Sequence, residues 1–280
     1  MKLLRYGPVN EEKPGLLDSD GTIRDLSQEI DDITPSQLSP AAIKRLRNLD
    51  PSTLPSVKND TRIGVPVSGI GKIVAVGLNY ADHATEAGLP IPDEPVLFTK
   101  TTSAISGPYD PVRIPRGSKK TDWEVEIAFV IGSVASYVDE SEAASHIAGY
   151  CILNDVSERE FQIERGGQWM KGKCADTFAP IGPWLVTPDE VGDPQTLNMW
   201  LDVNGKRFQE GSTDTMIFNC MFCLSYISQF MTLNPGDVVT TGTPPGVGLG
   251  QKPPVFLTSG DVMTLSIERL GEQRQEVIAA

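Results

Sequence analysis

The sequence predicts a mostly β fold of the α+β class, in which a few helices cover the strands. From about residue 67 to residue 280 the chain is dominated by short β-rich runs that end in turn residues, a pattern typical of strands. Helical patterns are few and fall near residues 140–147, 157–165 and 215–231. Since strands and helices do not alternate regularly, the pattern argues against a parallel βαβ protein.

Residues 1–66 differ in texture and predict a small N-terminal α+β domain with a linker. The segments MKLLRY and GLLDSDGTIRDL predict short strands, with DSDG as the turn between two of them. The segment SPAAIKRLRNL predicts a short helix, with Ser39 as its N-cap and Pro40 at its first position. The polar, proline-containing segment DPSTLPSVKNDTRIGVPV leads into a second domain over residues 67–280.

The second domain contains both strand and turn signals. GKIVAVGLN and HIAGYCILND are apolar runs that end in Asn or Asn-Asp, and Asn204-Gly205 between two alternating segments predicts a hairpin. The stretch GTPPGVGLG, residues 242–250, lacks the Gly-Lys-Ser/Thr ending and the following helix of a phosphate loop. We interpret it as a rigid loop whose backbone can approach a ligand closely.

The composition is that of an ordinary soluble protein with an acidic balance. Of its 280 residues 39% are hydrophobic and 22% are charged, and the net charge is −13. This balance argues against nucleic-acid or anionic-membrane partners, which need clustered Lys and Arg. No apolar run reaches the roughly 18 residues of a membrane span or resembles a signal peptide, so a cytoplasmic protein is expected. The expected state of the four cysteines is a reduced thiol, because the lone C-x-x-C at Cys220 and Cys223 is a weak zinc signal in an apolar helix.

The stretch TDWEVEIAFVIG, residues 121–132, predicts a strand with two carboxylates on one face. Alternate residues from Trp123 to Ile131 are apolar, so Glu124 and Glu126 point the same way, roughly 7 Å apart. On this stretch alone, one explanation is a solvated face of an antiparallel sheet. The other is a shared cation.

Asp155, which ends the run GYCILND, is a candidate third ligand. A carboxylate after an apolar strand is costly to bury unpaired. Together with Glu124 and Glu126 it would supply three oxygen ligands, a set that suits Mg²⁺, Mn²⁺ or Ca²⁺ rather than Zn²⁺. The alternative is that Asp155 caps a helix that starts at Val156-Ser157.

His83 is the candidate general base. It lies in NYADHATEAGLP, where Asp82 can cap a short helix and Gly88 can end it. Glu86 follows three residues later on the same face, and a carboxylate beside an imidazole raises its basicity. The only other histidine, His146, is expected to be structural or at the surface.

Three further polar residues are candidates for contact with an anionic substrate. Arg159 follows Asp155 by one helical turn, and Gln162 follows Arg159 by three residues, so both can face the same site. Arg159 could bind an anionic substrate in a bidentate ion pair. Lys173 lies in the glycine-containing segment QWMKGKCADTF, where a lysine is more often exposed.

These segments occur in an order that resembles the fumarylacetoacetate hydrolase family. The order is N-Y-A-D-H-x-x-E, D-W-E-x-E, N-D-V-S-x-R-x-x-Q, G-K-x-x-D-T-F and T-G-T-P-P-G-V-G, and it spans nearly the whole chain. The opening MKLLRYG, with EKPGLLDSDG and QIERGGQW, further resembles the bacterial 2,4-diketo-3-deoxy-L-rhamnonate hydrolase branch. The resemblance implies the family's mixed β-sandwich roll or barrel-like fold and a homodimer.

The resemblance also implies roles for the candidate residues. It implies that His83 and Glu86 form a water-activating dyad on a mobile lid helix, with Lys173 as the active-site lysine. The implied cofactor is one Mg²⁺ or Mn²⁺ per subunit. The implied ligands of this ion are Glu124, Glu126 and Asp155, and the implied substrate contacts are Arg159, Gln162 and Thr243.

The implied activity is cleavage of the C3–C4 bond of a 2,4-diketo acid, an acylpyruvate, to pyruvate and a carboxylic acid. The branch implies 2,4-diketo-3-deoxy-L-rhamnonate as the substrate, in sugar acid catabolism. Within the family, the alternatives are a decarboxylase or tautomerase acting on oxaloacetate and an isomerase acting on 2-hydroxyhepta-2,4-diene-1,7-dioate. Outside it, the alternative is a non-catalytic metal-binding protein.

Overall fold

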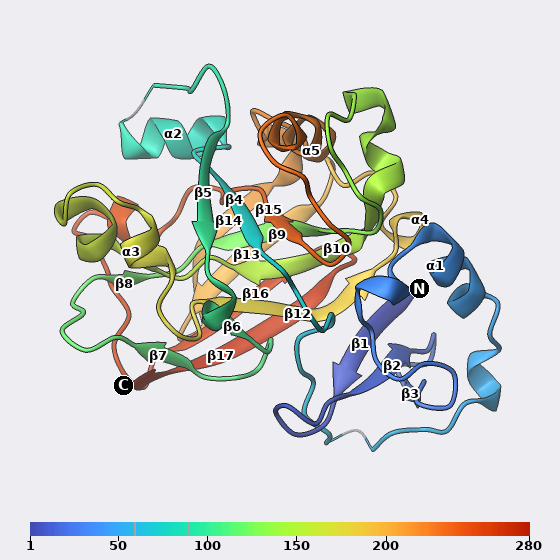
Figure 1. The fold of residues 1–280 in the computed structure, drawn as a ribbon. Helices are drawn as coiled ribbons and strands as arrows, with labels where there is room; N and C mark the ends of the chain where they lie inside the picture. The colour runs from blue at the N-terminus through green and yellow to red at the C-terminus, as the bar shows by residue number, and fades with distance from the viewer. Residues whose placement is uncertain (59, 89) are drawn as a thin grey trace.

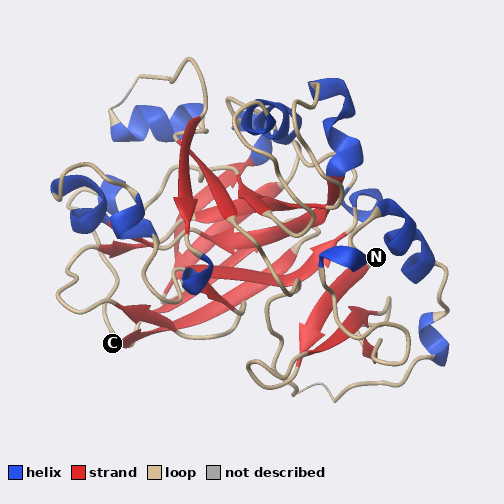
Figure 2. Ribbon diagram, viewed as in Figure 1, coloured by secondary structure: helices blue, strands red, loops and turns tan. Residues whose placement is uncertain are grey.

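The computed structural model describes residues 1–58, 60–88 and 90–280 (Figure 1). Strands form most of the regular structure and short helices lie around them (Figure 2). The predicted mostly β fold with a few covering helices is therefore confirmed. The sheets are open and do not close into a barrel. No helix among the described residues is long and apolar enough to cross a membrane.

The larger sheet carries the strands that position the site. Its spatial order is β3 (Ile23–Asp25), β2 (Lys13–Leu17), β1 (Lys2–Tyr6), β12 (Ala179–Val186), β10 (Ile147–Asn154), β9 (Val125–Ile131), β15 (Val238–Thr240), β4 (Ile73–Gly77) and β5 (Val96–Lys100). The short strand β6 (Ile105–Ser106) pairs with β12 beside this path. Most neighbours are antiparallel, but β15 and β4 run parallel.

The second sheet packs on the first. Its order is β14 (Lys206–Ser212), β13 (Asn198–Val203), β16 (Val262–Ile267), β17 (Gly271–Ala279) and β7 (Val112–Ile114). Strands β13 and β16 contact β9, and β17 contacts β10 and β12. A separate pair joins β8 (Thr121–Asp122) to β11 (Ser157–Glu158).

Strand β9 is buried along its whole length, which decides between the two explanations of its carboxylates. It lies between β10 and β15 in the sheet, and β13 and β16 cover it. Glu124 and Glu126 are 5% and 2% exposed. The explanation by a solvated face is therefore wrong, because both carboxylates are buried and hydrogen-bonded to other parts of the chain.

The N-terminal strands extend the larger sheet. Leu3 of β1 pairs with Leu185 of β12, and Figure 1 shows β1, β2 and β3 at the opposite end of the molecule from α2 and α3. Helix α1 (Pro40–Arg47) has the predicted N-cap, because Ser39 accepts a hydrogen bond from Ala42 N. The division of the chain into residues 1–66 and 67–280 stays a prediction.

The helices depart in part from the sequence expectations. The expected helix near 140–147 is the 3-10 helix Glu140–His146, and the one near 215–231 is the shorter α5 (Cys220–Ser228). The expected helix near 157–165 begins instead with strand β11, and only Glu160–Glu164 forms a π-helical turn. A short helix, α4 (Pro188–Val191), follows β12.

Turn chemistry predicted the hairpins correctly. Asn204 and Gly205 have φ values of 52° and 75° and join β13 to β14, as expected for the left-handed conformation of a tight hairpin.

Cys220 and Cys223 are buried free thiols on α5, as predicted. Burial raises the pKa of Cys220 to about 12, so this thiol stays protonated.

Candidate active site

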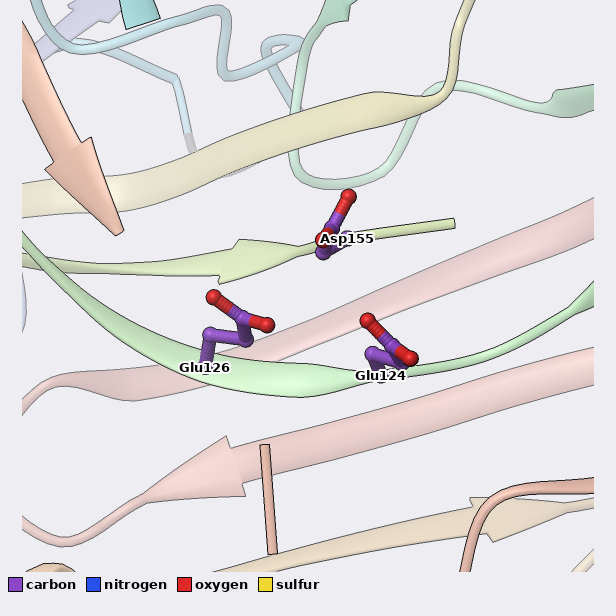
Figure 3. A group of neighbouring side chains, drawn as sticks. All are labelled: Glu124, Glu126 and Asp155. Carbon is purple, nitrogen blue, oxygen red and sulfur yellow. The ribbon is translucent and has the colours of Figure 1, made fainter. Parts of the chain in front are cut away.

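Three carboxylates converge where β9 and β10 run side by side (Figure 3). Glu126 lies in β9, Glu124 immediately precedes it, and Asp155 immediately follows β10. The backbone N–H of Asp155 donates to the carbonyl oxygen of Glu124 at 2.9 Å, which fixes the two residues opposite each other. One oxygen from each of the three side chains lies within 4.8 Å of the others.

Asp155 does not cap a helix, which corrects that alternative. Its neighbours Ser157 and Glu158 form β11, and its side chain is fully buried. The carboxylate accepts hydrogen bonds from Lys100 Nζ at 2.5 Å and from Lys173 Nζ at 2.6 Å. Two ammonium groups thus compensate the charge that the apolar strand would otherwise bury unpaired.

Lys173 lies between two of the carboxylates. It belongs to α3 (Met170–Lys173), is 2% exposed, and donates to Glu124 Oε2 and Asp155 Oδ2 at 2.6 Å each. The expectation that a lysine in this segment is exposed is therefore wrong. Burial alone would lower the pKa of Lys173, but Asp155 and Glu124 raise it above its ordinary value. The side chain accordingly carries its positive charge.

Arg159 joins the carboxylates to the loop beyond them. Its guanidinium donates to Asp122 Oδ2 at 2.8 Å, to Glu124 Oε1 at 2.6 Å and to Gln162 Oε1 at 3.0 Å. Burial would raise the pKa of Glu124, yet Arg159 and Lys173 outweigh it and lower this pKa to about 2. Glu124 is therefore an ionised carboxylate.

Glu126 differs from its two neighbours because its described donors are neutral. Thr240 Oγ1 and the backbone N–H of Gly242 donate to its Oε2. Burial, together with the like charges of Asp155 and Glu124, raises the pKa of Glu126 well above its ordinary value. A further cation beside Glu126 would relieve this repulsion.

The pair His83 and Glu86 lies on helix α2 (Ala81–Ala87), close to the glycine-rich loop, residues 242–250. His83 Nδ1 is 3.1 Å from Glu86 Oε2. The backbone N–H of Gly246 donates to both oxygens of Glu86, at 2.9 and 3.1 Å. Gly88, with φ 67°, ends the helix as predicted, but Tyr80 rather than Asp82 is its N-cap. The carboxylate of Asp82 lies in the first turn and accepts from the backbone N–H of His83.

All nine candidate residues line one cavity of about 580 Å³. They are His83, Glu86, Glu124, Glu126, Asp155, Arg159, Gln162, Lys173 and Thr243. Thr243 accepts from Gln209 and donates to the carbonyl oxygen of Val125, so its hydroxyl is already bonded on two sides. His146 does not line this cavity and lies 3.4 Å from the carbonyl oxygen of Ser133, as expected of a structural histidine.

The sequence expectations missed two charged residues of this region. Lys100 is fully buried at the end of β5 and also donates to the carbonyl oxygen of Val156. Asp122 accepts hydrogen bonds from the backbone N–H groups of Gly248 and Leu249 and thereby ties the glycine-rich loop to Arg159. One signal in the sequence could have identified Lys100. It ends the apolar run VLFTK, and a lysine that is buried at the end of such a strand needs an acidic partner.

Lys100→Met should destabilise the metal-free protein. Removal of the ammonium leaves the buried carboxylate of Asp155 with one fewer cation, at a cost of about 3 kcal/mol in the free energy of unfolding. Urea unfolding followed by circular dichroism measures this loss. The matched control is Lys120→Met, which breaks the solvent-exposed ion pair with Glu164 and should lower the stability far less, because water screens that pair. Equal losses in the two variants would contradict the structural role of Lys100.

The sequence model of the family described as fumarylacetoacetate (FAA) hydrolase C-terminal matches residues 72–278 of this chain. The chain belongs to this family. It is 60% identical over the full length of both chains to a protein from Burkholderia multivorans that is named only as a hydrolase of unproven activity. The family resemblance noted in the sequence is thus confirmed.

Two solved structures of family enzymes are similar over their whole length. Fumarylacetoacetate hydrolase from the psychrophilic Exiguobacterium antarcticum is 35% identical with a TM-score of 0.88, and each chain is fully covered. Maleylpyruvate hydrolase from Sphingobium sp. SYK-6, solved in complex with manganese(II) ion and pyruvate, is 29% identical with a TM-score of 0.82, again with full coverage. The protein is therefore an enzyme of the fumarylacetoacetate hydrolase family with a buried acidic triad.

Proposed function

We propose that the protein is a divalent-metal-dependent hydrolase that cleaves the C3–C4 bond of a 2,4-diketo acid. The observation that carries the proposal is one cavity in which a buried acidic triad faces a histidine–glutamate dyad. The products are pyruvate and the carboxylic acid derived from the acyl group. The homodimer and the cytoplasmic location stay predictions.

The residues present fit a bound Mg²⁺ or Mn²⁺. Glu124, Glu126 and Asp155 offer oxygen donors alone, which hard divalent cations prefer. The repulsion that raises the pKa of Glu126 also favours an added cation at this place. When bound, the ion supplies positive charge beside the 2-oxo group, where negative charge develops as pyruvate leaves.

In this proposal His83 accepts a proton from the attacking water, and Glu86 orients His83. Glu86 fixes the imidazole through Nδ1 and leaves Nε2 to take a proton from water. The water oxygen then attacks the C4 carbonyl, the C3–C4 bond breaks, and C3 is protonated to give pyruvate. Because Gly246 holds Glu86, the position of the base depends on the glycine-rich loop.

The remaining candidates bind and orient the substrate. Lys173 stabilises the C4 oxyanion or supplies the proton to C3, and its raised pKa keeps it protonated for either task. Gln162 binds Arg159 through Oε1, which leaves its amide N–H groups for the substrate. Arg159 already holds Asp122 and Glu124, so a substrate carboxylate would share it rather than occupy it alone.

Release of pyruvate tests the proposal. The purified protein with Mg²⁺ should release pyruvate from at least one acylpyruvate, measured with lactate dehydrogenase and NADH. The panel includes 2,4-diketo-3-deoxy-L-rhamnonate, the substrate of the branch that the sequence resembles. Oxaloacetate, assayed for decarboxylation, and 2-hydroxyhepta-2,4-diene-1,7-dioate, assayed for isomerisation, test the alternatives. Absence of pyruvate from every acylpyruvate would refute the hydrolase proposal.

A further inference from the structure

The cavity has an apolar side beside the base of helix α2. We name this side the acyl wall and define it by three residues. They are Leu78, Phe98 and Trp169. Leu78 follows directly after β4, a few residues before His83, and Phe98 lies in the neighbouring strand β5. In the proposed reaction, the water that His83 activates attacks C4 of the substrate. The remainder of the acyl group, which is bonded to C4, therefore lies close to the acyl wall.

Trp169 is fixed in the acyl wall by the residue that faces it. A Cβ at Gly77 would lie 2.5 Å from Cζ3 of Trp169, so the indole occupies space that only a glycine at this position leaves free. The rings of Trp169 and Phe98 pack edge to face with centroids 5.4 Å apart. Strand β5 also packs against α3, the helix that follows Trp169 (Figure 1).

The acyl wall begins beside the charged cluster. Nζ of Lys173 lies 5.1 Å from the ring centroid of Phe98. A short substrate can therefore place its 2-oxo acid end at the carboxylates and its other end against the wall. The two ends of the cavity differ in chemistry because the cluster holds the charges and the wall carries only apolar side chains.

Few cations that line the cavity are free to form an ion pair with a second carboxylate of the substrate. Arg159 and Lys173 already form ion pairs with the cluster. Among the residues that the structure describes, Lys252 is the one cation lining the cavity that has no ion pair, and it is exposed. A carboxylate placed against the acyl wall would lose its hydration without gaining a partner, which is unfavourable.

We propose that Trp169 determines specificity and that the cavity takes 2-oxo acids whose far end is uncharged and mainly apolar. This inference rests on the proposed function, because the proposed chemistry places the 2-oxo acid end at the carboxylates. The lactoyl end of 2,4-diketo-3-deoxy-L-rhamnonate, which carries one hydroxyl and a methyl group, belongs to this class. Maleylpyruvate, with its second carboxylate, does not.

Binding of two probes of equal carbon number tests the proposal without any turnover. Isothermal titration calorimetry of the Mg²⁺-loaded protein compares 2-oxohexanoate, which has an apolar tail, with 2-oxoadipate, which ends in a carboxylate. We expect 2-oxohexanoate to bind about tenfold more tightly, since its tail gains apolar contact. Trp169→Ala should bring the ratio of the two dissociation constants close to one, and Gly77→Ala, which displaces the indole, should also reduce it.

The controls separate specificity from general damage. Trp200→Ala removes a half-buried tryptophan of β13 outside the cavity and should leave the ratio unchanged. A purely structural role of Trp169 would weaken both probes equally and keep the ratio, which would overturn the proposal. Tighter binding of 2-oxoadipate, with that preference lost in Lys252→Met, would also overturn it. Either result leaves the hydrolase proposal standing if the panel releases pyruvate, so the two failures are distinguishable.

Discussion

His83→Ala should lower kcat for pyruvate release by about 10²- to 10⁴-fold, the usual contribution of a general base. The loss follows because water at neutral pH is a poor nucleophile and His83 is the imidazole of this cavity. The binding of 2-oxohexanoate should change little, since the carboxylates that hold the ion are untouched. Steady-state kinetics with the best acylpyruvate of the panel, together with calorimetry, measures both effects.

His146→Ala is the matched control, because the chain has only these two histidines. Its imidazole lies outside the cavity, next to the carbonyl oxygen of Ser133, so kcat should stay within about twofold of the wild-type value. If His83→Ala keeps most of its activity on acylpyruvates, His83 is not the general base of the hydrolysis. If the main activity is instead on oxaloacetate and survives His83→Ala, the result favours a decarboxylase or tautomerase, which needs no attacking water.

Glu126→Gln should abolish tight binding of the divalent ion. Loss of a residue that only orients a metal ligand costs about 10- to 100-fold in metal affinity, so loss of a ligand should cost at least about 100-fold. The variant should also fold well, because a neutral side chain relieves the repulsion with Asp155 and Glu124 that raises the pKa of Glu126. Elemental analysis after gel filtration measures the bound ion, and thermal unfolding measures the stability.

Glu158→Gln provides the comparison for this variant. Glu158 is also a fully buried glutamate, but it accepts hydrogen bonds from Ser118 and Lys120 and does not line the cavity. It should keep the ion even if its stability falls. Full retention of the ion by Glu126→Gln would remove Glu126 from the metal site. Loss from both variants would point to general disruption of the sheet.

The sequence by itself determined the local features of this protein. Alternation of apolar residues predicted strand β9 with Glu124 and Glu126 on one face, and Asn204-Gly205 predicted a hairpin. The three-residue spacing of His83 and Glu86 placed both on one turn of α2. These features were accessible because strand periodicity, helical spacing and turn conformation depend on neighbours within a few residues.

Only the tertiary structure decided which of the two explanations of the acidic strand holds. The ammonium of Lys173 binds Glu124, 49 positions away in the sequence, and that of Lys100 binds Asp155, 55 positions away. The same is true of Trp169, whose place in the acyl wall depends on the missing side chain of Gly77. Burial and ion pairing depend on the order of strands in the sheet. Local patterns do not encode that order, so the sequence showed which residues carry charge and the fold decided which charges meet.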